Sequence, residues 1–84
     1  MSQVHLGELA MELDDVPGAR SEFEDALQRY PQSPSSQYAK AMLAVLDQKR
    51  GDAVFLLKKL REQNLDERLA VLVKLRLRAL EAAP

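Results

Sequence analysis

The 84-residue sequence contains no cysteine and no tryptophan, and it has only two phenylalanines, two tyrosines and one histidine. The lack of cysteine excludes disulfide bonds and thiol catalysis, and a single histidine leaves too few ligands for a structural zinc site. The core must therefore be built from Leu, Val, Ala and Met, most of which favour helices. We expect no metal and no cofactor.

Catalytic patterns are also missing. Three scattered glycines do not make a glycine-rich phosphate loop, and Ser33, Ser35 and Ser36 have no adjacent general base. The adjacent carboxylates Asp14 and Asp15 fall in a predicted turn, where aspartate commonly caps a helix. His5 has no second histidine or cysteine with which to share a metal ion. We therefore predict that the protein is not an enzyme.

The sequence has no long apolar run. Runs such as Ala41 to Leu46 and Leu69 to Val73 are far too short to span a bilayer, which takes about 20 residues. The first residues lack the basic start and apolar stretch of a secretory signal. We expect a cytoplasmic protein with no membrane insertion.

Charge is balanced overall but unevenly distributed. The formal net charge is −1, yet residues 1–47 carry eight acids against three bases, and residues 48–84 carry five acids against nine bases. A nearly neutral chain has no general attraction to nucleic acid or membranes. The acidic first half and basic second half would allow head-to-tail pairing between copies.

Helical spacing of apolar residues and punctuation by Pro, Gly and Asp predict five helices joined by short turns. They are expected over about residues 3–13, 17–30, 34–48, 53–63 and 67–82. We expect Ser2, Asp15, Ser33 and Asp66 to cap four of them, and we expect a tight turn at Arg50-Gly51-Asp52. Such a chain should be all-α, with antiparallel neighbours.

The last of these segments is ambiguous. Residues 71–78 alternate between apolar side chains and mainly basic ones, which is typical of a strand. The Leu, Ala, Lys and Arg content and the length of about 16 residues favour a helix instead. We predict a helix.

A repeat is visible across the first two helices. Leu6-Gly7 and Ala10 are followed by Ala19, Phe23, Ala26 and Pro31, and this spacing resembles the tetratricopeptide repeat (TPR). A shift by one repeat period of the family gives a weaker second copy, in which Ala53 replaces Ala19 and Leu57 replaces Phe23. The resemblance implies a single TPR-like domain, an α-solenoid with repeats at residues 1–33 and 34–65 and a capping helix at 66–84.

The resemblance also implies a function, because the first helix of each TPR pair lines a concave face that binds other proteins. On that face the geometry of the family places the partner-binding candidates Met11, Tyr38, Met42, Val45, Leu72 and Arg76, together with Glu8. Of the positions that hold the carboxylate clamp of some family members, only Arg76 has a suitable side chain, so that clamp is absent. The expected function is a protein-binding scaffold, an adaptor or a small chaperone-like subunit for a partner peptide or helix.

Two further predictions concern the C-terminal helix. Its apolar residues lie on more than one side, which suggests a surface for a partner or for self-association into an oligomer. Lys74, Arg76 and Arg78 form a basic cluster, so a helical domain that binds nucleic acid is the alternative function. Few Asn, Gln or Ser side chains, which could hydrogen-bond to the edges of nucleobases, accompany these basic residues. Nucleic-acid binding is therefore the weaker alternative.

Overall fold

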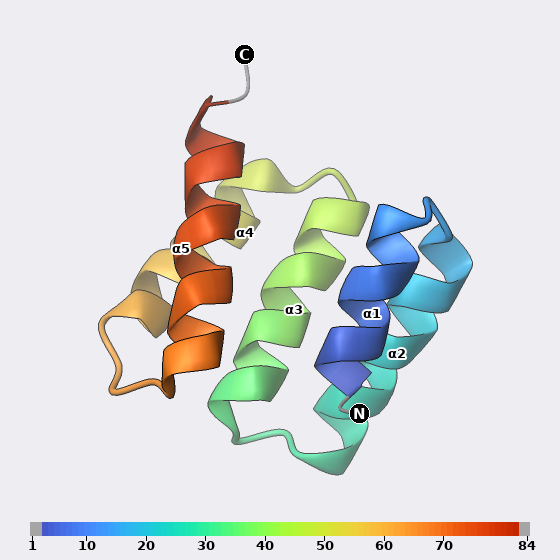
Figure 1. The fold of residues 1–84 in the computed structure, drawn as a ribbon, viewed down its shortest axis with the longest axis horizontal. Helices are drawn as coiled ribbons and strands as arrows, with labels where there is room; N and C mark the ends of the chain where they lie inside the picture. The colour runs from blue at the N-terminus through green and yellow to red at the C-terminus, as the bar shows by residue number, and fades with distance from the viewer. Residues whose placement is uncertain (1–2, 83–84) are drawn as a thin grey trace.

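The computed structural model describes residues 3–82, with side chains from residue 6 onward. Within this range the chain forms five α-helices and no strand (Figure 1). The helices are α1 (Gln3–Glu12), α2 (Val16–Arg29), α3 (Pro34–Leu46), α4 (Arg50–Arg61) and α5 (Glu67–Ala82). The all-α prediction is confirmed, and the alternating segment 71–78 is helical. The predicted cap Ser2 and the side chain of His5 lie outside the described part.

Side-chain caps begin three of the helices where the sequence predicts them. In each case an oxygen of the capping residue accepts a hydrogen bond from the backbone N–H three residues later, which satisfies a donor that the helix itself leaves free. The pairs are Asp15 with Gly18 (3.1 Å), Ser33 with Ser36 (3.1 Å) and Asp66 with Leu69 (2.8 Å).

The turns that end α1 and α3 have the same geometry. Asp14 and Gln48 each have a positive φ, 61° and 62°, and they are one repeat period apart in the chain. In each turn, the backbone N–H of the following residue donates a hydrogen bond to the carbonyl oxygen five residues earlier. Asp15 donates to Ala10 and Lys49 donates to Ala44, each at 2.8 Å. Both turns are therefore Schellman motifs, formed here without glycine.

The predicted turn at Arg50-Gly51-Asp52 is wrong, because α4 already begins at Arg50. The chain has reversed by residue 49 through the motif at Gln48, so nothing prevents the next residues from becoming helical. Asp52 lies in the first turn of α4, where its negative charge interacts favourably with the helix dipole.

Consecutive helices pack against one another along the chain, and small residues allow them to approach closely. A Cβ atom added to Gly7 in α1 would lie 2.6 Å from the Phe23 ring in α2. Positions that correspond in the two predicted repeats are buried in both hairpins: Ala19 and Ala53, Phe23 and Leu57, and Ala26 and Leu60.

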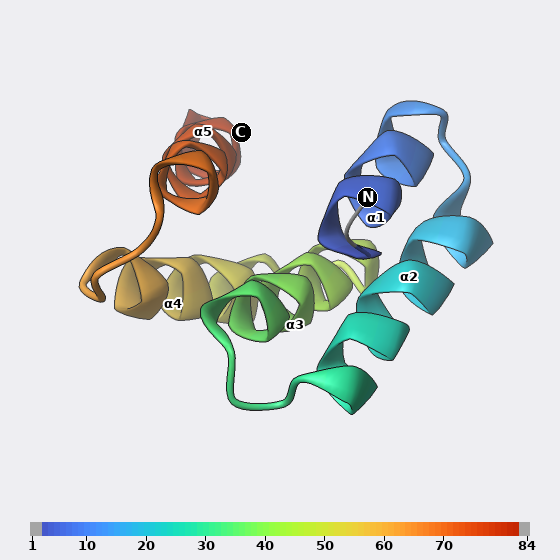
Figure 2. The same ribbon diagram turned by 60° about the horizontal axis from the view of Figure 1, so that its bottom comes forward.

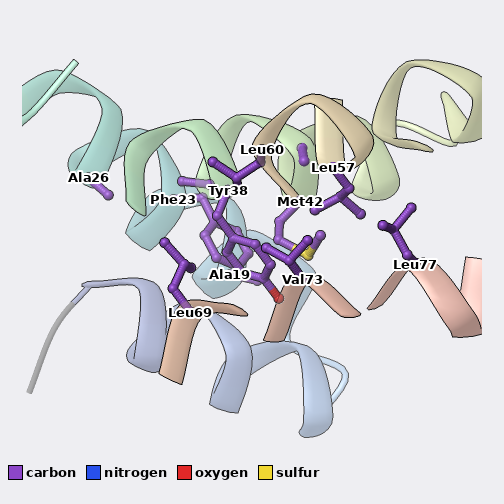
Figure 3. Close-up of a cluster of buried hydrophobic side chains, with 12 residues drawn as sticks. Ala19, Phe23, Ala26, Tyr38, Met42, Leu57, Leu60, Leu69, Val73 and Leu77 are labelled. Carbon is purple, nitrogen blue, oxygen red and sulfur yellow. The ribbon is translucent and has the colours of Figure 1, made fainter. Parts of the chain in front are cut away.

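Figure 1 shows α5 and α1 on the two flanks of α3, and the turned view in Figure 2 shows that both lie above α3. Beneath them, buried side chains from four helices form one cluster, which includes Phe23 of α2, Tyr38 and Met42 of α3, Leu57 of α4 and Val73 of α5 (Figure 3). The first, third and fifth helices thus present one common face, which we call the α1–α3–α5 face.

Candidate functional site

A polar network joins the three helices of the α1–α3–α5 face. The Tyr38 hydroxyl donates a hydrogen bond to Oε1 of Glu8 at 2.5 Å. The other carboxylate oxygen, Oε2, accepts a hydrogen bond from Nη2 of Arg76 at 2.7 Å, which is also an ion pair. Glu8 of α1 therefore connects the α3 tyrosine to the α5 arginine, although Glu8 and Arg76 are 68 residues apart in the chain.

The network is largely shielded from water. Tyr38 is completely buried, and the side chains of Glu8 and Arg76 are 15% and 26% exposed. No buried side-chain nitrogen or oxygen among the described residues lacks a hydrogen-bond partner. Since an unpaired buried polar group costs about 1–3 kcal/mol, each partner depends on the others being present.

Burial and the adjacent Glu8 carboxylate both raise the pKa of the Tyr38 phenol, so it remains a neutral donor at physiological pH. Burial by itself would lower the pKa of Arg76, but the negative charge of Glu8, the Tyr38 hydroxyl and hydrogen bonding together outweigh burial, so the pKa of the guanidinium is raised. The cluster therefore contains a cation, an anion and a neutral hydroxyl. It can hold helices together, and the partly exposed arginine can also meet an acidic group.

The six predicted partner-binding residues divide into two groups. Tyr38 and Met42 are fully buried, because side chains of neighbouring helices cover the middle of α3. Met11, Val45 and Leu72 pack against the core and remain partly exposed, as does Arg76. In this conformation a partner can touch these four residues but not Tyr38 or Met42.

The accessible apolar residues lie on the same stripes as the network. Met11 is three residues after Glu8, Val45 is seven after Tyr38, and Leu72 is four before Arg76. Residues spaced by three, four or seven positions share one side of a helix. Apolar contacts on all three helices therefore accompany the ion pair.

Sequence reasoning placed Glu8, Tyr38 and Arg76 on one face but did not connect them. The signal was present: an acid beside Met11 and a base beside Leu72 lie on the two helices that flank the tyrosine. Helical spacing predicts on which side of a helix a residue lies. It does not predict how far that helix is shifted along its axis relative to a distant helix. The pairing of α1 with α5 therefore needed the structure.

Several large apolar side chains are exposed elsewhere. Leu13 and Val16 lie at the α1–α2 turn, and Val71 and Leu75 lie on α5. Phe55 of α4 is also exposed, and the Lys59 amine lies 5.6 Å from the centre of its ring. These residues lie outside the predicted face.

The described residues contain no group of three or more acidic, histidine or cysteine side chains placed to hold a metal ion. None of the described helices is long and apolar enough to cross a membrane. Comparison of the chain with protein-family models, curated proteins and solved structures gave no match. The resemblance to the TPR family stays a prediction, and the support for a function comes from geometry alone.

Proposed function

We propose that this chain is a protein-binding scaffold or adaptor, built as a TPR-like array, that holds a helix or peptide of a partner on the α1–α3–α5 face. The supporting observation is the combination of partly exposed Met11, Val45 and Leu72 with the largely shielded pair of Glu8 and Arg76. Apolar contact would supply affinity, and the ion pair would supply orientation.

The chemistry of the face defines the partner's chemistry. Methionine adapts its shape to different apolar groups, so Met11 suits an aliphatic or aromatic side chain of the partner. Arg76 forms one hydrogen bond to Glu8, and its guanidinium has further donors for a carboxylate. The expected ligand is an amphipathic helix with an apolar stripe and an acidic residue beside it.

The test is a selection of helical peptides from a random library against the full chain, with counter-selection against Leu72→Asp. Backbone amide shifts then map the site of a selected peptide. We expect shifts at Met11, Val45, Leu72 and Arg76, and at least a tenfold loss of affinity in Leu72→Asp. Phe55→Asp is the matched control, because Phe55 is an exposed apolar residue on α4 and should not affect binding. Shifts centred on Phe55, or no selected binder, would refute the proposal.

A nucleic-acid-binding domain is the second candidate, because Arg61, Lys74 and Arg78 line one shallow hollow beside α4 and α5. The acidic Glu81 lines the same hollow, which weakens its attraction for phosphate. Salt-sensitive retention on heparin that disappears in Lys74→Glu/Arg78→Glu would favour this function. Absence of any nucleic-acid shift at low salt would exclude it.

A further inference from the structure

Each end of the helical array has an uncovered apolar stripe. On α1 and the residue that follows it, Leu6, Leu9 and Leu13 are 36%, 37% and 80% exposed, and their spacing of three and four places them on one side of the helix. On α5, Val71 and Leu75 are 50% and 56% exposed and are four residues apart. We call these the α1 stripe and the α5 stripe.

The α5 stripe occupies the side of the helix on which the next helix packs in the first hairpin. Gly7, Ala41 and Leu75 are related by steps of one repeat period. Gly7 is buried against Phe23 of the following helix α2, and Ala41 is completely buried. Leu75 is exposed, since no helix follows α5 within the described residues.

The α1 stripe lies on a different side of its helix, where Leu9 has apolar counterparts in α3 and α5. Leu9, Leu43 and Leu77 are related by the same step along the chain. Leu77 belongs to the core and is 2% exposed in α5, a helix that packs against its preceding neighbour α4. Leu43 packs against the core as well, whereas Leu9, which has no described helix before it, is 37% exposed. Each stripe therefore includes a position that a neighbouring helix covers elsewhere in the array and that is uncovered here.

The charges near the stripes are opposite. Next to Leu13 lie the exposed acids Glu12, Asp14 and Asp15, whereas exposed bases outnumber acids around the α5 stripe, where Asp66 and Glu67 lie only at the N-terminal end. These bases are Arg68, Lys74 and Arg78. Contact between an α1 stripe and an α5 stripe brings opposite charges together, but contact between two α5 stripes brings like charges together, which is unfavourable.

From these observations we infer that the occupant of each stripe is a second copy of this chain, with the α1 stripe of one copy packed on the α5 stripe of the next. Such a head-to-tail contact leaves one stripe free at each end, so it can extend into a chain of copies or close into a ring. One helix side from each copy forms the contact, so association should be weak and dependent on concentration. The inference goes beyond partner binding, since it uses other residues.

Sedimentation equilibrium on the full chain tests the inference. The average mass should rise above the monomer value of 9.4 kDa as concentration increases, and it should fall back when salt screens the charges. Constant monomer mass up to high micromolar concentration would overturn it. Association that salt leaves unchanged or strengthens would overturn the pairing of charges, and this measurement needs no variant.

Two variants separate the stripes: Leu13→Asp disables the α1 stripe and Leu75→Asp disables the α5 stripe. Both side chains are more than half exposed, so the fold should survive, and circular dichroism checks this. Each variant alone should remain monomeric, but an equimolar mixture should form a dimer and stop there. In that dimer, the intact α5 stripe of Leu13→Asp binds the intact α1 stripe of Leu75→Asp.

The outcomes are distinguishable. If Leu13→Asp alone still associates, the α1 stripe is not involved and the inference is overturned, as it is if the mixture stays monomeric. Phe55→Asp is the control and should associate like the wild type, because Phe55 lies on α4 outside both stripes. Peptide binding measured on the same variants separates this inference from the proposed function, since neither Leu13 nor Leu75 belongs to the α1–α3–α5 face.

Discussion

At the scale of single residues, the two Schellman turns contain side chains that are not the most stable choice for their backbone conformation. Glycine is favoured at the left-handed position of this motif, yet the chain has Asp14 and Gln48 there. Aspartate tolerates positive φ better than a long side chain does. Gln48 is thus the less favourable of the two.

We expect Gln48→Gly to raise the free energy of unfolding by about 1 kcal/mol, since glycine carries no steric penalty at φ 62°. Gln28→Gly is the matched control: Gln28 is exposed within α2, where glycine should cost about 1 kcal/mol. Urea unfolding monitored by circular dichroism measures both. Destabilisation by both substitutions would show that the turn does not require positive φ.

At the scale of elements, the sequence predicted what local rules determine. Asp15, Ser33 and Asp66 cap helices because a short polar side chain before a helix satisfies a free N–H, whatever the rest of the fold does. The sequence predicted too late a start for α4, because the Schellman motif at Gln48 lacks the glycine by which such a turn is recognised in a sequence. The predicted face could not reveal that Tyr38 and Met42 are covered, since burial there depends on how neighbouring helices pack over α3.

Tyr38, which links α1 to α3, should make the stability of the fold depend on pH in the alkaline range. Because the pKa of Tyr38 is higher in the folded chain than in the unfolded chain, its neutral form is favoured by folding. This contribution is complete below about pH 10, the ordinary tyrosine pKa, and is lost as pH rises towards the folded pKa. The expected result is a fall in stability above that pH.

Tyr38→Phe isolates this effect. The variant should lose about 1.5–3 kcal/mol at neutral pH, because a hydrogen bond to a charged acceptor is removed, and its stability should fall less steeply in alkali. Tyr30→Phe is the matched control, since Tyr30 is 61% exposed, and it should behave like the wild type. An unchanged alkaline slope in Tyr38→Phe would contradict the role given to this phenol. Urea unfolding across the pH range provides both values.

At the scale of the whole molecule, the chain combines a shielded polar link with uncovered apolar surface. Small domains bury only about 60% of their unfolded surface, so exposed leucines at both ends are expected unless something covers them. The proposed partner site and the proposed self-contact lie on different sides of α1 and α5. Copies could therefore stack while each α1–α3–α5 face stays available.

Both proposals require α1 and α5 to be held in place relative to α3, and the ion pair of Glu8 with Arg76 is the contact that connects them. The most direct measurement is a double-mutant cycle with Glu8→Gln, Arg76→Met and the double variant, followed by urea unfolding. We predict that the pair couples by about 1–3 kcal/mol, as contacting residues in one network do. Additive effects of the two substitutions would contradict the account, because α1 and α5 would then not be joined across α3.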